Sequence, residues 1–516
     1  MSQIFRVKPI DAIIKDSASQ GEDNGLKRVL GLPSLMALGV GTILGTGVFV
    51  LTGSAAAEYA GPSLIISFII AAIACAFSGL CYSEFAASIP VAGSAYTYGY
   101  ATLGEVVAFV IALDCIMEFA LGASAVAVGW SGYCYSFLQD VCGPISPRFI
   151  DVPGTEYVLW KERWVPAGSI SDAAAAAGVD ISTLQHTVSS GNFLALALIV
   201  VLALLLVRGV ELSSVINTFI VVLKLSIVLV FVGVVGKYVL GNMDAAIQNW
   251  TPFIPDNTGE FGKFGWSGIA RGAAVLFFAY VGFDCVSTAA QEAKNPTRDV
   301  PLATLGSLLV CTIAYIVVCL LITGTINYTQ LNVADPAARA IDATGVTWGI
   351  FFIKGGLTVG LISGTLALLM SLSRIIFSMA NDGLLPQVLS RVHPRFSSPW
   401  TATLIPAIPV ALLTAFYPIG ELGELVSLGA LMAFTIVCAS IIVLRKKYPD
   451  RERQFSTPWV PFVPIMGSLI SAGLMCSLSG QAWMRFGIFF IIGMIFYFAY
   501  SVKHSKLNTD VPSLTK

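Results

Sequence analysis

Charged residues are scarce in this sequence. Only 11% of its 516 residues are Asp, Glu, Lys or Arg, against about 25% in soluble globular domains. The formal net charge is −1, and the basic residues form no stripe, which excludes nucleic acid as a partner. Because 56% of the residues are hydrophobic and the mean hydropathy is +0.82, we predict an all-α integral membrane protein solvated by the lipid bilayer.

Residues that bind metals or catalyse reactions are scarce as well. None of the three histidines (His186, His393 and His504) falls in the middle of an apolar stretch, and the ten cysteines form no CxxC pair. We therefore predict no metal site, no cofactor and no enzymatic activity. Most cysteines lie in apolar runs and are interpreted as small buried hydrophobes. Cys134 and Cys142 lie near a predicted outer loop, where a disulfide is the less favoured alternative.

Apolar windows separated by polar breaks predict about twelve membrane-spanning helices. Their expected starts are Pro33, Pro62, Glu105, Asn192, Ser213, Trp266, Leu302, Thr347, Thr401, Glu424, Pro461 and Met484. An even number places both termini on one side, and the distribution of Lys and Arg favours the cytoplasm. The polar stretch 140–190 is expected to form an extracytoplasmic cap of short helices.

Two of the predicted spans share an internal pattern. The first contains Gly45-Thr46-Gly47 and then Ala55-Ala56-Ala57-Glu58, and the sixth contains Tyr280-Val281-Gly282-Phe283 and then Ala289-Ala290-Gln291-Glu292. Each is an apolar helix interrupted by glycine and followed by small residues that end in a glutamate. The odd offset of five spans gives the two segments opposite directions through the membrane, as an inverted repeat requires.

Glycines are concentrated in the first span, at Gly39, Gly41, Gly45 and Gly47. Each weakens a helix by roughly 1 kcal/mol relative to alanine. The spacing GxGxxxG does not fit a dinucleotide loop, and no strand-helix-strand unit surrounds it. One interpretation is close helix packing. The other is a helix unwound at Gly45 to Gly47, whose free N–H groups bind a carboxylate.

The sixth span offers a complementary half of such a site. A break near Gly282 would expose carbonyl groups able to accept hydrogen bonds from an α-ammonium group. Asp284 has a plain alternative role as N-cap of the half-helix that follows. The side chains of Phe278, Tyr280 and Val281 either line a pocket or pack, and their position beside the break favours the pocket.

Lys224 stands in the middle of the fifth predicted span, with about ten residues of helix on either side. This depth is too great for its ammonium group to reach the membrane surface easily, and a charge there costs at least about 2.5 to 3.5 kcal/mol. It should therefore face a polar interior. Lys224 then has two functional interpretations, a group that loads and releases a proton or a fixed charge in place of a coupling sodium ion. A structural lysine bonded to carbonyl groups is the third.

Asp114 and Glu118 lie four residues apart in the third predicted span, on one face of the helix. Two acids at this depth indicate a polar seam. Structural hydrogen bonding and a proton relay are both compatible with the pattern.

Four motifs in these spans resemble those of a known family. They are Gly45 to Gly53, Phe277 to Thr288, Glu292 with Asn295 to Pro301, and Ser378 to Pro386. With them the chain, from Leu26 to the last span, resembles the amino acid, polyamine and organocation transporter superfamily, and within it the bacterial members of the cationic amino acid transporter family. Two features depart from the family pattern. Ser371-Leu372-Ser373-Arg374 replaces a Gly-Gln pair before the arginine, which leaves substrate choice open, and the loop before Asn192 is long.

The resemblance implies a fold and a set of site residues. The fold is a five-plus-five inverted repeat with helices 1 and 6 broken, working by alternating access. Residues 1–30 would be a cytoplasmic segment, 31–240 and 241–445 the two repeats, and 446–516 two extra helices and a cytoplasmic tail. The implied site residues are Gly45, Thr46 and Gly47 for the carboxylate and the backbone around Ala279, Tyr280 and Val281 for the ammonium, with Ile43 and Gly282 as further substrate-binding residues. The resemblance also implies Phe278 as gate, Lys224 for proton coupling and Glu118 on the third helix.

We therefore predict a secondary active amino acid permease of the bacterial cytoplasmic (inner) membrane, linked to protons. Small neutral amino acids are favoured as substrates, and cationic ones are the alternative. Obligate exchange and sodium symport are competing mechanisms, and a membrane receptor for amino acids is a more remote one. The sequence does not define the oligomeric state.

Overall fold

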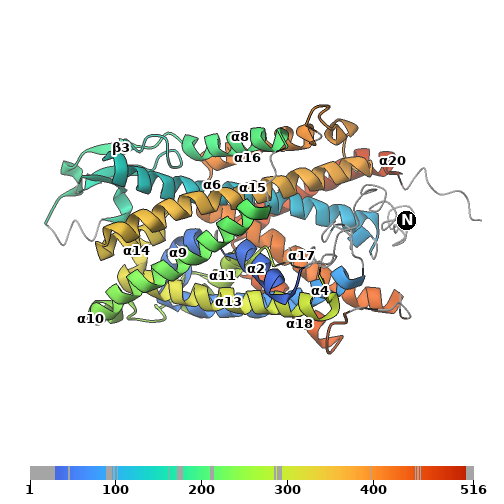
Figure 1. Ribbon diagram of the computed structural model, residues 1–516, viewed down its shortest axis with the longest axis horizontal. Coiled ribbons are helices and arrows are strands. Elements are labelled where there is room, and N and C mark those ends of the chain that lie inside the picture. Colours follow the sequence, from blue (N-terminus) through green and yellow to red (C-terminus); the bar gives the residue numbers. More distant parts are fainter. Residues whose placement is uncertain are drawn as a thin grey trace, which may run out of the picture.

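The computed structural model describes residues 30–506 except 45–46, 89–95, 97–98, 101–102, 161, 171–177, 210–213, 284–285, 287–292, 397, 448, 450–452 and 454. The predicted N-terminal segment, Gly45, Thr46, Asp284 and the run Ala289 to Glu292 thus lie outside the described residues, apart from Leu30. The chain is mostly helical, and its long helices run side by side along one axis (Figure 1).

Twelve principal helices follow one another in the described part of the chain. They are α2 (Leu32–Ile43), α4 (Leu64–Ser88), α6 (Glu105–Cys142), α8 (Phe193–Val207), α9 (Ser214–Gly241), α11 (Gly265–Leu276), α13 (Pro296–Thr325), α15 (Thr347–Asn381), α16 (Trp400–Phe416), α17 (Ile419–Lys447), α18 (Phe462–Cys476) and α19 (Gly480–Phe496). The short α-helices are α3 (Thr52–Ala55), α10 (Met243–Asn249), α14 (Pro336–Thr344) and α20 (Val502–His504). Short π-helical turns occur at η1 (Gly47–Leu51), η2 (Ala56–Ala60) and η10 (Tyr497–Ser501), and 3-10 turns at η3 (Gly61–Ser63), η4 (Ala167–Ser169), η5 (Ile181–Thr183), η6 (Phe277–Tyr280), η8 (Tyr328–Gln330) and η9 (Gln387–Ser390).

The predicted positions of the helices agree with this arrangement. Every predicted start lies near the start of one of the described helices, and the largest difference is between Leu302 and the observed start of α13 at Pro296. Within the described part of the chain, seven helical stretches are long and apolar enough to cross a membrane, and α8, α16 and α18 are shorter apolar helices. The prediction of a multi-pass helical membrane protein is therefore supported.

The outer surface of the bundle is apolar, as contact with lipid requires. On α9, Phe219, Leu229 and Leu240 are each more than 60% exposed, and α19 exposes Ile491, Ile492 and Ile495 to a similar extent. Such continuous apolar surface is uncommon on water-soluble monomers. Inside the bundle, α6 packs against α15 and α17, and most of its residues are buried.

The prediction that 140–190 forms only short helices is wrong, although the 3-10 turns η4 and η5 do lie in this segment. The described residues of this segment form a three-stranded antiparallel sheet in the order β2-β1-β3, with β1 at Glu156–Trp160, β2 at Arg163–Pro166 and β3 at His186–Val188. It lies at the same end of the bundle as α14 and opposite α20 (Figure 1). The aromatic and β-branched residues of β1 and β2 favour strands. A two-residue connection joins Trp160 to its partner Arg163, and Glu162 in it adopts a φ of 64°.

Candidate functional site

The first helical interruption lies after α2. The last residue of α2 is Ile43, and Leu44 has extended backbone angles, φ −68° and ψ 122°. Gly45 and Thr46 lie outside the described residues, and Gly47 begins the π-helical turn η1. Helical geometry therefore ends at Ile43, which leaves carbonyl groups of the last turn of α2 without partners inside their own helix.

The second interruption lies after α11. The α-helix ends at Leu276, the 3-10 turn η6 follows, Val281 is extended with φ −56° and ψ 133°, and Gly282 has a φ of +116°. Only glycine adopts this last conformation readily. A Cβ on Gly282 would also lie 3.2 Å from the backbone carbon and oxygen of Thr42, so close approach and conformation both require glycine.

The two interruptions touch each other. The Thr42 hydroxyl lies 3.0 Å from the carbonyl oxygen of Gly282, and equally close to two carbonyl groups of its own helix. A Cβ on Gly47 would lie 2.1 Å from Cα and Cβ of Ala279, so these two backbones meet with no space for a side chain. The predicted residues Gly47, Ala279 and Gly282 are thus brought together, although they are far apart in sequence.

The hydroxyl group of Tyr315, on α13, joins the same two segments. It lies 2.8 Å from the carbonyl oxygen of Ile43 and 2.8 Å from that of Ala279. The Tyr315 side chain is fully buried, and its ring lies 5.3 Å from those of Phe68 and Tyr280, centroid to centroid. Sequence reasoning missed this residue, because one tyrosine in an apolar helix has the pattern of an ordinary core residue.

The aromatic side chains beside the second interruption have different surroundings. Phe278 is 4% exposed and lies against Gly122 of α6, where a Cβ would be 3.4 Å from its ring. The Tyr280 hydroxyl donates to the carbonyl oxygen of Phe68 and lies 3.2 Å from the Thr312 hydroxyl. The Tyr280 side chain is therefore held by α4 and α13.

Lys224 is buried where α9 packs on α15. If Gly360 of α15 carried a Cβ atom, it would lie 3.5 Å from Cγ and 3.7 Å from Cε of Lys224. One turn earlier on α9, Val221 packs on Gly41 of α2. The side chain is 8% exposed, and no hydrogen bond or ion pair links it to any described residue. Lys224 is thus buried beside α15, and the polar surroundings predicted for it stay a prediction.

Asp114 and Glu118 share one face of α6, together with Gly122. Asp114 is fully buried, neither of its carboxyl oxygens has a hydrogen-bond partner in the described structure, and Oδ1 would be 2.9 Å from a Cβ on Gly429 of α17. Glu118 lies one turn further along, and Gly122 one turn beyond it contacts Phe278. The two acids therefore lie in line with the second interruption.

A group of four charges near the small sheet was not predicted. The side chain of Lys354, on α15, is fully buried, and its Nζ lies 2.7 Å from Asp140 of α6 and 2.7 Å from Asp342 of α14. Arg163 of β2 completes the group: its guanidinium contacts Asp140 and lies 2.8 Å from Oδ2 of Asp342. The group joins the sheet to three helices, beside a cavity of 340 Å³ lined in part by Asp140 and Arg163.

A second unpredicted group holds the segments that flank the two interruptions. Glu424 of α17 accepts hydrogen bonds from both Nε and Nη2 of Arg271 on α11, at 3.0 and 2.7 Å, and from the Tyr59 hydroxyl in η2 at 3.0 Å. The Ser479 hydroxyl donates to its other oxygen. The half-helix before one break and the turn after the other are thereby fixed to the same carboxylate.

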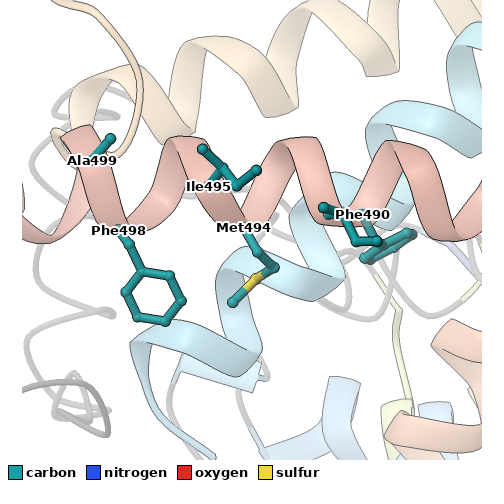
Figure 2. Close-up of a pocket in the computed structure, with 6 residues that line it drawn as sticks. Phe490, Met494, Ile495, Phe498 and Ala499 are labelled. Atoms are coloured by element: carbon teal, nitrogen blue, oxygen red, sulfur yellow. The ribbon is translucent and has the colours of Figure 1, made fainter.

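A large groove on α19 and the adjoining turn η10 has an apolar lining. It is lined by Phe490, Ile491, Met494, Ile495, Phe498 and Ala499, all on one stretch of helix (Figure 2). Its lining side chains carry no nitrogen, oxygen or charge, so it offers nothing to fix the orientation of a polar ligand. The meeting point of the two interruptions is the better candidate for a binding site, because backbone carbonyl groups there have partners outside their own helix.

The disulfide alternative at Cys134 and Cys142 is wrong. Both thiols are free, and both lie on α6, eight positions apart on a rigid helix. At a rise of 1.5 Å per residue their Cα atoms are about 12 Å apart, beyond the reach of a disulfide.

Comparisons with known proteins extend over nearly the whole chain. The sequence model described as amino acid permease matches residues 30–500. The methylthioribose transporter of Bacillus subtilis is 39% identical over 508 residues, which cover 98% of this chain and 100% of that protein. The branched-chain amino acid permease BcaP of the same species is 40% identical over 506 residues, 98% and 99% of the two chains. The vacuolar cationic amino acid transporter 4 of Arabidopsis thaliana is 34% identical over 453 residues, 87% and 68% of the two chains.

Proposed function

Because this chain belongs to the amino acid permease family, we propose that it is a secondary transporter that moves amino acids across a membrane by alternating access. The family membership bears out the resemblance found in the sequence motifs. The observation that carries the proposal is the meeting of two interrupted helices at Gly47, Ala279 and Gly282, inside a bundle with an apolar surface.

The site of the proposed transport is the backbone at this meeting point. The substrate carboxylate would be bound by the N–H groups of Gly45, Thr46 and Gly47. The substrate ammonium would be bound by the carbonyl groups of Ile43 and of Ala279 to Gly282. A zwitterion is then bound without charged side chains, which suits a low-dielectric interior where an unpaired ion is costly. Phe278 would cover the ligand from the side of α6. The close fit of Gly47 to Ala279 supports this arrangement, because the two half-sites lie in contact.

The proposed architecture is that of about twelve spans in a five-plus-five inverted repeat, with breaks in helices 1 and 6. The two repeats are residues 31–240 and 241–445, and the polar segment 140–190 lies on the outer side of the membrane. The N-terminal segment 1–30 is cytoplasmic. Two extra helices and a cytoplasmic tail make up residues 446–516. The membrane is the bacterial cytoplasmic membrane. The support is the position of the two interruptions, which lie at corresponding places in the two halves.

We assign the coupling step to Lys224. Its ammonium has no ion pair among the described residues, so a proton can be gained or lost there without breaking a salt bridge. In this proposal the proton passes along α6 by way of Asp114 and Glu118 toward Phe278. Sodium symport and obligate exchange are the competing mechanisms, and a receptor without transport is the remote one.

Small neutral amino acids are the favoured substrates, because Asp284 is the one acidic residue in the sequence stretches Ile43 to Gly47 and Phe278 to Asp284 that adjoin the two interruptions. A second candidate substrate is methylthioribose, because a protein named for its transport is 39% identical over the whole length. This sugar has neither a carboxylate nor an ammonium group, so it would use the breaks differently.

Uptake into liposomes tests the proposal. Purified protein in vesicles with an inward proton gradient should accumulate one or more labelled amino acids, and a thermal-shift screen of the twenty amino acids selects the first candidates. Vesicles preloaded with amino acid test exchange, and a sodium gradient tests symport. If methylthioribose is the only compound taken up, the second candidate is correct, and if nothing is taken up, transport is refuted.

A further inference from the structure

We propose that Tyr315 is a positioning residue for the substrate ammonium, a role that rests on the proposed function. It is the described side chain whose hydroxyl lies within hydrogen-bond distance of a carbonyl from each interruption, Ile43 and Ala279, at 2.8 Å in both cases. Both acceptors lie where the α-helical pattern has ended, so their carbonyl groups are available to a ligand.

One hydroxyl cannot satisfy both carbonyl groups. A tyrosine hydroxyl has a single hydrogen to donate, so at any moment one of the two oxygens lacks this bond. An ammonium group has three N–H donors. When a substrate ammonium binds between the breaks, the Tyr315 hydroxyl donates to one of these two carbonyl oxygens. The ammonium donates to the other one. Tyr315 therefore keeps the two oxygens at the separation that the ammonium needs.

The hydroxyl is held rigidly enough for this role. The Tyr315 ring is fully buried between Phe68 and Tyr280, with ring centroids 5.3 Å apart on both sides. The Tyr280 hydroxyl is engaged elsewhere, by the Phe68 carbonyl and Thr312, and does not compete for the same oxygens. Packing therefore fixes the direction in which the Tyr315 hydroxyl points.

The test compares Tyr315→Phe with Thr304→Val. Phenylalanine keeps the ring and removes only the hydroxyl. Thr304→Val also removes a buried hydroxyl from α13, but one that bonds within its own helix, to the carbonyl of Val300. Binding is measured for three probes: the amino acid that the wild type takes up fastest, its 2-hydroxy acid, which lacks the ammonium, and its methyl ester, which lacks the carboxylate.

The expected result is a selective loss. Tyr315→Phe should bind the amino acid and its methyl ester about 5-fold more weakly, the size of one net hydrogen bond, and the 2-hydroxy acid as the wild type does. Thr304→Val should leave all three affinities unchanged. Unchanged binding of the amino acid by Tyr315→Phe would overturn the inference, and so would equal weakening for all three probes, which is the mark of a structural role.

Protein stability is measured in parallel, with and without the amino acid. A lower melting temperature of unliganded Tyr315→Phe leaves the comparison of probes intact, because each probe is referred to the same variant. If the wild type neither binds nor takes up any amino acid, the proposed function itself fails. If the wild type transports and Tyr315→Phe retains its preference for the ammonium, only the role of Tyr315 fails.

Discussion

Two lysines lie inside apolar helices of this protein, and their surroundings differ. Lys354 of α15 has two carboxylates within 2.7 Å and a second cation, Arg163, bound to the same acids. Lys224 of α9 packs on Gly360, six residues further along α15, and has no ion pair among the described residues. Two adjacent carboxylates favour the charged form of an ammonium group, whereas an ammonium without an ion pair lacks that stabilisation. Sequence depth alone therefore does not distinguish a structural lysine from one suited to coupling.

The largest expected effect is on stability, from Lys354→Met. Removing this ammonium leaves Asp140 and Asp342 with Arg163 as their remaining partner in the group, and breaking a buried ion pair costs about 3 kcal/mol or more. Unfolding of the detergent-solubilised protein, followed by intrinsic fluorescence, measures the loss. A change below about 1 kcal/mol would show that the group is not a stabilising anchor.

Lys224→Met should change transport strongly and stability little, in contrast to Lys354→Met. Methionine fills the same space against Gly360 and removes a costly buried ammonium, so stability should change by no more than about 1 kcal/mol. Uptake driven by a proton gradient should fall by about 10-fold or more, because coupling then lacks its proton carrier. Gradient-driven accumulation at the wild-type level would remove Lys224 from the mechanism.

Gly360→Asp is designed to make Lys224 resemble Lys354. The new carboxylate would stand beside the Lys224 side chain, since a Cβ at this position lies 3.5 Å from Cγ and 3.7 Å from Cε. An ion pair should hold the lysine in its charged form, and gradient-driven uptake should drop by about 10-fold.

Gly360→Ala is the matched control for this substitution. Its methyl group makes only ordinary contacts, and wild-type uptake is expected. Equal loss of uptake in the Ala and Asp variants would assign the effect to volume rather than to charge.

A smaller effect than that of Lys354→Met is expected from pH, through a titrating acid near Lys354. Asp335, just before α14, has its pKa raised from 3.8 to about 6, first by burial, with Asp342 adding to the rise while Arg339 and Lys354 oppose it. The folded state therefore keeps a proton between about pH 4 and pH 6 that the unfolded chain has lost. Stability should fall as the pH rises through this window, by about 2 kcal/mol.

Asp335→Asn tests this expectation, because the amide does not titrate. Thermal unfolding of the variant should vary less between pH 4 and pH 6 than that of the wild type. Identical slopes for the two proteins would contradict the assignment.

The sequence predicted much of the helical framework, because long apolar windows separated by polar breaks record the thickness of the membrane. It also predicted the interruption near Gly282, where a positive φ demands glycine. It did not predict the role of Lys354, although Lys224 and Lys354 have similar apolar neighbours along the chain. The difference between them comes from Asp140, Asp342 and Arg163, which the fold brings together from distant segments.

Other features required knowledge of the folded chain. Tyr157 to Trp160 include the aromatic and β-branched residues that strands favour, but the sheet depends on pairing with the separate segments β2 and β3. Tyr315 carried no signal at all, because its partners are backbone oxygens of residues 272 and 36 positions away.

The carboxylate of Glu424 has a consequence for the conformational cycle. It holds Arg271 and Tyr59 at once, and these residues belong to the two segments that adjoin the breaks, α11 and η2, which also pack on each other. If one segment tilts away from α17 alone, a buried carboxylate loses part of its hydrogen bonding inside a low-dielectric bundle. Synchronous movement of both segments avoids that penalty, so this end of the pathway is expected to open in a single concerted step with no half-open intermediate.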